Sequence, residues 1–232
     1  MGTLSVVATP IGNLEDITLR ALRILKEADL VLCEDTRVTK KLLSHFDIHV
    51  STQSFHAHSA LSKIEHIIGL LEEGKKLVLV TDAGTPAISD PGSLLVEKVR
   101  EQLGDSVKIE AIPGPSALTA ALSIAGVPIS DFVFLGFLPH KKGRETLFKE
   151  IAVSERAIVF YESPHRILKT LESLVKHFDI VGQSGRMVSI AREITKIYEE
   201  VLRGTPSQLL SIFTEHEEKV RGEFVVIVGP RV

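Results

Sequence analysis

Two aspartates frame a run of small residues in TDAGTPAISDPG at 81–92, a stretch that directly follows an apolar run typical of a buried strand. The stretch carries no Lys or Arg, although a phosphate-binding loop usually adds a lysine to its backbone amides. Neither G-x-x-x-x-G-K-S/T nor G-x-G-x-x-G occurs in the chain, so both common nucleotide-binding motifs are missing. Asp82 and Asp90 instead suit a ligand that offers a cation and hydroxyl or ammonium donors, as S-adenosylmethionine does. The alternative is that both aspartates only cap turns beside the prolines.

A second loop of similar composition is IPGPSALTAAL at 112–122. Gly114 lies between two prolines and predicts a sharp turn, and Ser116 can cap the helix that follows. The alanines of that helix leave room for another group to approach closely, although a plain capped packing helix would look the same. Together with VATPIGNL at 7–14, the two loops favour a ligand site.

Strand-like and helical patterns alternate along the whole chain, which predicts the α/β fold class. Gly74 and Gly104 follow helical patterns, at positions where a left-handed residue commonly ends a helix. The alternation restarts after the Pro-Gly-Pro turn, so we expect two α/β domains of similar size, 1–114 and 115–232. Because ligands of open α/β sheets bind outside the carboxyl ends of the strands, the loops at these ends should carry the chemistry.

The composition of the 232 residues limits the class of protein. A single cysteine excludes an internal disulfide framework and indicates a reducing, cytoplasmic location. The apolar runs are far shorter than the roughly 18 residues of a membrane helix, so we expect no membrane partner. Since the net charge is −3, a nucleic acid would have to be bound by a local basic patch.

Eight stretches, taken in their order along the chain, resemble the tetrapyrrole methylase superfamily. Within this superfamily they resemble the branch that methylates a cytidine 2′-hydroxyl of small-subunit (16S) ribosomal RNA. The resemblance runs from residue 4 to about residue 229. It implies two α/β domains with S-adenosylmethionine in a cleft between them, a homodimer, and ribosomal RNA or the small ribosomal subunit as partner. The stretches are ATPIGNLEDIT at 8–18, CEDTR at 33–37, SFHAH at 54–58, TDAGTPAISDPG at 81–92, IPGPSA at 112–117, FLGFLPHKKGR at 134–144, FYESPHR at 160–166 and AREITKIYEE at 191–200.

The resemblance also implies which residues line the cofactor, largely through backbone groups. Pro10 would form the floor of the cleft, and Ser116 with Ala117 would meet the methionine portion. The remaining positions would lie along the cofactor or flank its adenosine: Gly84, Ala87, Ile88, Ser89, Tyr161, Ala191, Glu223 and Phe224.

For the RNA we expect a set of charged and polar contacts. Arg37 would meet a phosphate, and the basic run PHKKGRE at 139–145 is the best phosphate-binding patch in an acidic chain, although a charge run is by default only solvated. The predicted substrate residues are Glu34, Thr36, Arg37, Lys141, Lys142, Arg144, Arg166 and Arg192.

A general base would assist the ribose hydroxyl, and we expect it among Asp35, Glu162 and His165. The alternative for Asp35, or for Thr36, is a helix N-cap. The stretch ESPHR predicts a helix start, with Ser163 as the cap and Pro164 in the first helical position. For Glu162 and His165 the alternative is helix capping and surface pairing.

No metal site is expected. His56 and His58 would share a strand face, but a third ligand at a suitable spacing is missing. Cys33 is expected to be a buried apolar residue and not a nucleophile.

Two other functions stay open at this point: methylation of a tetrapyrrole or another small molecule, and a binding module without catalysis. The basic run at 139–145 and CEDTR favour RNA, since a porphyrin needs an apolar trough and the chain has no Trp and only 5% aromatic residues.

Overall fold

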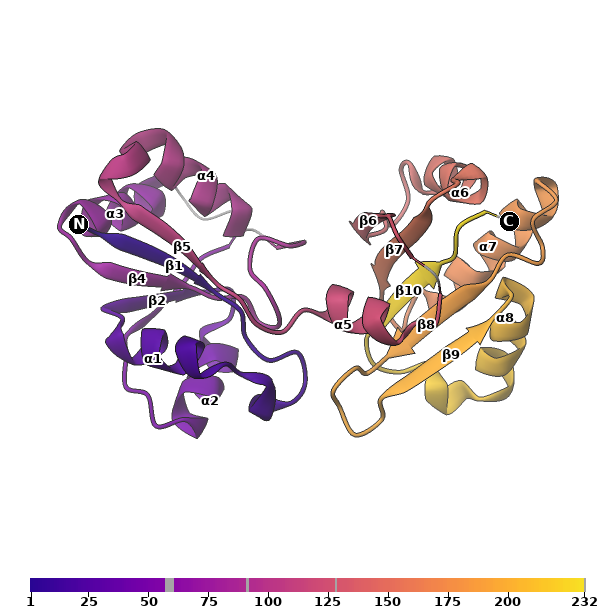
Figure 1. The fold of residues 1–232 in the computed structure, drawn as a ribbon, viewed down its shortest axis with the longest axis horizontal. Coiled ribbons are helices and arrows are strands. Elements are labelled where there is room, and N and C mark those ends of the chain that lie inside the picture. The colour runs from indigo at the N-terminus through magenta and orange to yellow at the C-terminus, as the bar shows by residue number, and fades with distance from the viewer. Residues whose placement is uncertain (57–60, 91, 128, 232) are drawn as a thin grey trace. The chain divides into compact units, whose positions relative to one another are not determined.

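The computed structural model describes residues 1–56, 61–90, 92–127 and 129–231 (Figure 1). They group into two compact units, Met1–Ser116 and Ala117–Val232. The boundary after residue 114 that the sequence suggests for two domains stays a prediction.

The first unit is built on a parallel sheet in the order β3-β2-β4-β1-β5. Helices α1 and α2 cover one face of this sheet and α3 and α4 cover the other (Figure 1). Residues alternate between these faces along each strand, so Val78 packs with α1 and α2, whereas Leu77 and Leu79 pack with α3 and α4. The elements are β1 Thr3–Val7, 3-10 turn Leu14–Asp16, α1 Leu19–Glu27, β2 Leu30–Cys33, α2 Thr36–His45, β3 Thr52–Ser54, α3 Leu61–Glu72, β4 Lys76–Leu79, α4 Gly92–Leu103, 3-10 turn Gly104–Ser106 and β5 Lys108–Ile112.

Side chains and glycines set the ends of these helices. The Thr18 hydroxyl accepts a hydrogen bond from the Ala21 amide at the start of α1. Gly74 follows α3 with a φ of 86°, and the amides of Gly74 and Lys75 donate to the carbonyls of Leu71 and Leu70. Gly104 also has a positive φ, directly after α4. Both glycines therefore end their helices as predicted.

The second unit has a mixed sheet in the order β6-β7-β10-β8-β9. Its strands β6 and β7 are parallel, but β10 inserts antiparallel between β7 and β8, and β8 pairs antiparallel with β9. The α/β class is confirmed, and the carboxyl ends of these strands do not all lie at one edge. The elements are α5 Ala117–Ile124, β6 Phe132–Phe137, α6 Arg144–Val153, β7 Ala157–Glu162, α7 Ile167–Ile180, β8 Val188–Arg192, β9 Glu200–Gly204, α8 Pro206–Glu215, 3-10 turn Glu217–Lys219 and β10 Phe224–Val228.

The core of the second unit lies between this sheet and helices α6, α7 and α8. Arg186 is buried beside it, and its guanidinium donates to the carbonyls of Ile151 and Ala152 at the end of α6 and to that of Gly229. Burial lowers the pKa of Arg186 to about 10. This arginine adds hydrogen bonds to carbonyls of the last helical turn, where the Ile151 carbonyl also accepts from the Ser154 amide.

Candidate active site

The carboxyl ends of the parallel strands in the first unit all lie at one edge of its sheet. The adjacent strands β1 and β4 lead into α1 and α4, which cover opposite faces, so the chain diverges between them (Figure 1). Ligands of open α/β sheets bind at such a switch point. The loops after the two strands are joined there, since the Thr9 amide donates to the Gly84 carbonyl at 2.9 Å and the Gly84 amide donates to the Thr9 carbonyl at 3.0 Å.

Gly84 holds the centre of this edge. Its φ is 83°, and a Cβ at this position would lie 3.3 Å from Ile11 Cγ2 and 3.7 Å from the Pro115 carbonyl oxygen. The Thr85 hydroxyl donates to the same carbonyl at 3.1 Å. Three of the predicted loops, at 8–18, 81–92 and 112–117, are therefore packed together, and a larger side chain at Gly84 would disturb all three.

The backbone beyond Gly84 is strained, because Ala87 and Ser89 have φ values of 68° and 66°. Asp90 Oδ1 accepts hydrogen bonds from the amides of Ala87 at 2.9 Å and Gly92 at 2.7 Å, which hold this loop. Asp90 Oδ2 is buried and has no hydrogen-bond partner within the described part of the chain. A small-residue cradle with an unpaired carboxylate oxygen fits a ligand that brings a cation and hydroxyl donors.

Asp82 connects two loops, since its Oδ1 accepts a hydrogen bond from the Asp35 amide at 3.0 Å. The turn-capping interpretation therefore fits Asp90, which also keeps one free acceptor, whereas Asp82 joins the 81–92 loop to the start of α2.

Asp35 is the N-cap of α2, and its carboxylate pairs with the Arg37 guanidinium at 2.6 Å. Thr36 is the first residue of that helix. Hydrogen bonds from the Arg37 side chain and amide lower the pKa of Asp35 to about 2. So weak a base is poorly suited to take a proton at neutral pH. The Arg37 side chain is 86% exposed and stays available to a phosphate.

Glu34 has the opposite electrostatic surroundings. Burial raises the pKa of its carboxyl group, and the charges of Asp90 and Asp82 raise it further. The Thr81 hydroxyl donates to Glu34 Oε2 at 3.3 Å and so orients the group. Among the acidic residues described at this edge, Glu34 is the one whose pKa is raised, which is the direction that a general base needs.

In the second unit, the predicted cofactor residues Tyr161, Ala191 and Phe224 lie on three adjacent strands of the sheet. Val225 of β10 pairs with Tyr161 of β7 on one side and with Ala191 of β8 on the other. Because β10 runs antiparallel to both strands, its first residue, Phe224, lies beside their last residues. Ala191 and Phe224 are buried, so few of their atoms could contact a ligand.

The Tyr161 ring packs against Phe134 and Phe137, with centroids 5.0 and 5.3 Å away. Burial raises the pKa of its hydroxyl group. Glu223 is exposed and pairs with Lys196 at 2.8 Å.

Three further predicted cofactor positions are Pro10, Ile88 and Ala117. Pro10 directly follows Thr9, Ile88 is exposed, and Ala117 opens α5 immediately after Ser116.

Glu162, a predicted base, is the centre of a buried ion network. Its side chain is 0% exposed and lies 2.8 Å from Arg166 Nε and 3.5 Å from Arg144 Nη2. Thr170 Oγ1 and the Ser163 amide donate to it at 2.6 and 2.8 Å. With both carboxylate oxygens engaged and no access to solvent, Glu162 has the surroundings of a structural residue.

The two arginines of this network hold the segment before α6. Arg166 Nη1 donates to the Leu138 carbonyl at 2.7 Å, and Arg144 Nη1 donates to the Pro139 carbonyl at 3.2 Å. Both were expected to contact substrate, but their donors point into the protein. The exposed Lys141 and Lys142 follow this anchored segment.

The start of α7 was predicted incorrectly. The helix begins at Ile167, so Ser163 is not its cap and Pro164 is not its first residue. The Ser163 carbonyl instead accepts hydrogen bonds from the amides of Arg166 and Ile167 in a preceding turn. His165 is exposed in that turn.

Arg192 was also expected at the substrate, but it is only 7% exposed. It donates to the carbonyls of Lys219 and Tyr198, each at 3.0 Å, and lies 3.9 Å from Glu200. The contacts with Tyr198 and Glu200 hold the connection between β8 and β9, and the contact with Lys219 links it to the 3-10 turn before β10.

Of the two histidines expected on one strand face, the structure describes only His56, which is not in a strand. Strand β3 ends at Ser54, before His56, and His58 lies outside the described residues. Over the described ranges, no cluster of three His, Cys, Asp or Glu side chains could hold a metal ion. Cys33 is buried, and burial raises the pKa of its thiol, as expected for a packing residue.

None of the helices in the described ranges is long and apolar enough to span a membrane.

Sequence reasoning missed the threonines that support this edge. Thr81 orients Glu34, and Thr9 Oγ1 donates to the Thr81 carbonyl at 3.2 Å. Both residues follow the end of a strand, and that position was the available signal.

Residues 3–210 match the sequence model of the family Tetrapyrrole (Corrin/Porphyrin) Methylases. Among curated proteins, the chain is 46% identical to the Ribosomal RNA small subunit methyltransferase I of Thermotoga maritima over 229 residues, which cover 99% of each chain. It is 47% identical to the protein of the same name from Halalkalibacterium halodurans, over 98% of this chain and 75% of that one.

Solved structures share the fold at lower identity. The methyltransferase CobJ superposes with a TM-score of 0.71 at 21% identity, covering 99% of this chain and 95% of the other. The uroporphyrin-III-C-methyltransferase from Thermus thermophilus superposes with a TM-score of 0.67 at 18% identity, covering 99% and 94%. These similarities concern the fold alone.

Proposed function

Because the chain belongs to the tetrapyrrole (corrin/porphyrin) methylases, we propose that it transfers a methyl group to the RNA of the small ribosomal subunit. The observation that carries this proposal is the 46% identity to a small-subunit ribosomal RNA methyltransferase across 99% of both chains. At 21% identity or less, the similar solved structures support the fold and not their own substrates.

The finer part of the proposal is that the acceptor is the ribose 2′-hydroxyl of a cytidine and that the methyl donor is S-adenosylmethionine. When bound, this cofactor supplies an activated sulfonium methyl group, so the protein needs no metal. In the first unit, the residues that would hold it are Pro10, Gly84, the 87–89 segment and Ser116. The cradle at Gly84 and the unpaired Asp90 Oδ2 support this assignment.

The residues of the chain would bind and orient the RNA and move one proton. Glu34 would accept the proton of the 2′-hydroxyl on its carboxylate, because its raised pKa brings it closer to neutral pH than Asp35. Arg37 would contact a phosphate beside the target nucleotide. Alignment of the reacting groups would lower the barrier by about 7–11 kcal/mol. A general base would add a rate increase of about a hundredfold to ten-thousandfold, which is the smaller contribution.

Lys141 and Lys142, on the anchored segment before α6, would add further phosphate contacts. We also propose a homodimer, which light scattering in solution can test, and a cytoplasmic location, where ribosomal RNA is available. In the second unit, Tyr161, Ala191 and Phe224 stay predictions for the surroundings of the adenosine.

Methyl transfer from radiolabelled S-adenosylmethionine tests the function directly. Small ribosomal subunits, naked small-subunit RNA and uroporphyrinogen are offered in parallel, and nuclease digestion locates the label on cytidine ribose. We expect label in one or both RNA samples. Label in uroporphyrinogen alone would replace the proposal by the small-molecule alternative.

The substitution Gly84→Ala should weaken binding of S-adenosylmethionine by about tenfold to hundredfold. The new Cβ would strain a residue with a φ of 83°, and conformations of this kind cost about 1–3 kcal/mol. The free loop would relieve this strain by leaving the conformation that binds the cofactor, so binding would have to restore it at the expense of affinity. Calorimetric titration measures the affinity. The matched control is Gly69→Ala within α3, where a Cβ meets nothing within 4 Å, and this variant should bind the cofactor like the wild type. Equal affinities for the two variants would remove Gly84 from the cofactor site.

A further inference from the structure

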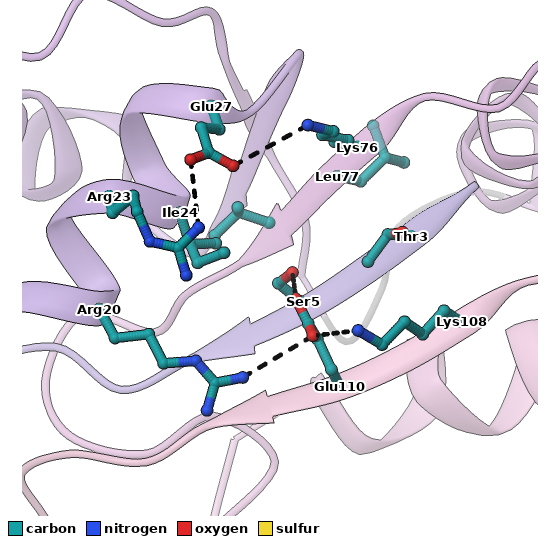
Figure 2. Close-up of a pocket in the computed structure, with 11 residues that line it drawn as sticks. Thr3, Ser5, Arg20, Arg23, Ile24, Glu27, Lys76, Leu77, Lys108 and Glu110 are labelled. Atoms are coloured by element: carbon teal, nitrogen blue, oxygen red, sulfur yellow. Dashed lines mark hydrogen bonds and ion pairs between the residues drawn. The ribbon is translucent and has the colours of Figure 1, made fainter. Parts of the chain in front are cut away.

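A cavity of about 370 Å³ lies at the amino-terminal half of the first sheet, on the face that α1 covers. Its floor is formed by residues of β1, β4 and β5, and α1 forms one wall. Figure 2 shows Arg20 and Arg23 of α1 on one side and Lys76 and Lys108 of the strands on the other. Lys76 and Lys108 are the first residues of β4 and β5, so this cavity lies at the end of the sheet opposite to the candidate active site.

The charges of this cavity are unbalanced. Two carboxylates, Glu27 and Glu110, face four cations, which leaves an excess of two positive charges in a chain whose net charge is −3. Each carboxylate holds one cation closely: Lys108 Nζ lies 2.7 Å from Glu110, and Arg23 Nη1 lies 3.1 Å from Glu27.

The other two cations are held loosely. Arg20 Nη2 lies 3.7 Å from Glu110, and Lys76 Nζ lies 3.9 Å from Glu27. Neither distance allows a direct hydrogen bond. Their side chains are 49% and 61% exposed, so an anion entering the cavity can reach both.

Glu110 is itself fixed, because Ser5 Oγ donates to its Oε1 at 2.9 Å. The hydrogen bond from Lys108 is the main cause that lowers the pKa of Glu110, so this group stays ionised and keeps the cations in place. Arg20 and Lys76 are thus kept near the cavity by charge, while their N–H groups make no direct hydrogen bond to Glu110 or Glu27.

We propose that this cavity binds the phosphate backbone of the substrate RNA through Arg20 and Lys76. The inference rests on the proposed function and adds a second RNA contact, distant from the transfer chemistry. A volume of 370 Å³ falls in the usual range for a small ligand, but such sites are mostly apolar, whereas this lining is dominated by charged side chains. Lysine and arginine contacts to phosphates are the main source of RNA affinity.

The position of the cavity also fits an extended substrate. The strands that separate it from the candidate active site are four or five residues long, about 13–17 Å at 3.3 Å per residue. A single nucleotide bound at the carboxyl edge would not reach the cavity, but a longer RNA strand would. The contact would therefore favour a large RNA over a small acceptor.

The double variant Arg20→Gln/Lys76→Gln tests this surface in the full-length protein. The probe is a labelled transcript of small-subunit ribosomal RNA, titrated at potassium chloride concentrations from about 50 to 300 mM. We expect binding at least about tenfold weaker at low salt and a salt dependence shallower by about two, one for each lost phosphate contact. The affinity for S-adenosylmethionine and the midpoint of thermal unfolding should not change.

The matched control is Lys98→Gln/Arg100→Gln on α4, which removes the same charge from the opposite face of the sheet. It should keep the wild-type salt dependence. The inference is overturned if the two double variants bind the transcript alike, or if the wild type does not bind it. The proposed function fails separately, if the wild type transfers no methyl group to RNA or to small subunits.

Discussion

Replacement of Glu162 by Ala should lower the free energy of unfolding by about 3–5 kcal/mol, the usual loss when one partner of a buried ion network is removed. Its carboxylate lies between Arg144 and Arg166, and its side chain is fully buried. The two guanidinium groups would remain in the protein interior without an anion. Urea unfolding followed by circular dichroism measures the change, provided that the slope with denaturant stays the same.

The loss of stability should extend to the segment before α6, because the guanidinium groups of the same two arginines donate to the carbonyls of Leu138 and Pro139. Glu162→Gln keeps the shape of the side chain, removes its charge and should also be strongly destabilising. The control Glu101→Ala removes an exposed carboxylate whose ion pair with Lys98 is solvated, and it should cost no more than about 1 kcal/mol. If Glu162→Gln abolished methyl transfer at unchanged stability, Glu162 would instead be a base.

The fold class could be predicted because it depends on local periodicity. Alternating apolar runs and helical patterns indicated the strands and helices of both units, and Gly74 and Gly104 indicated two helix ends. Strand order depends on pairing between distant segments, which periodicity does not encode. The insertion of β10 between β7 and β8 is such a case, since its partners precede it by more than 30 residues.

The residues of the candidate site also fall into those that local sequence could predict and those that it could not. The need for a small residue at Gly84 could be recognised, because its positive φ is a local requirement. The sharp turn predicted at Gly114 is not formed over residues 113–116, and this glycine instead lies close to Ala8, where a Cβ would be 3.0 Å from the Ala8 Cβ. The roles of the arginines could not, because a sequence gives their charge but not their burial. Arg144, Arg166 and Arg192 were expected to meet RNA, and all three donate mainly to buried groups and backbone carbonyls.

The same limit applies to the carboxylates. Glu34 and Asp35 are adjacent, and the sequence does not say which carboxyl group is the more shielded from water. The capping hydrogen bonds and the Arg37 ion pair stabilise the charge of Asp35, whereas burial and two neighbouring aspartates disfavour the charge of Glu34. Their pKa values therefore move in opposite directions, a pattern that separates a proton acceptor from a structural carboxylate.

Replacement of Glu34 by Gln should lower the rate of methyl transfer by about a hundredfold to ten-thousandfold, the usual contribution of a general base. The amide keeps the size of the side chain but cannot accept the proton. Calorimetry should show unchanged affinity for S-adenosylmethionine, since the base contacts the acceptor hydroxyl. In the wild type, the rate should fall as the pH decreases through the raised pKa of Glu34.

The same variant should be more stable than the wild type at neutral pH. The pKa of Glu34 is higher in the folded state than in the unfolded chain, so folding disfavours its ionised form. Its contribution to stability is complete below the unfolded pKa and is lost as the pH rises through the folded pKa. The difference in the midpoint of thermal unfolding between the variant and the wild type should therefore be largest at neutral pH and decrease on acidification.

Asp35→Asn is the matched comparison, because it removes the neighbouring charge from a residue whose pKa is about 2. Here the sign of the linkage is opposite: the depressed pKa stabilises the fold above the unfolded pKa, and this contribution is lost as the pH falls toward 2. Asp35→Asn should thus lose stability at neutral pH and keep most of its transfer rate at saturating RNA. If its rate fell further than that of Glu34→Gln while the latter stayed active, Asp35 would be the base, and the partial burial of Glu34 would be a property of packing alone.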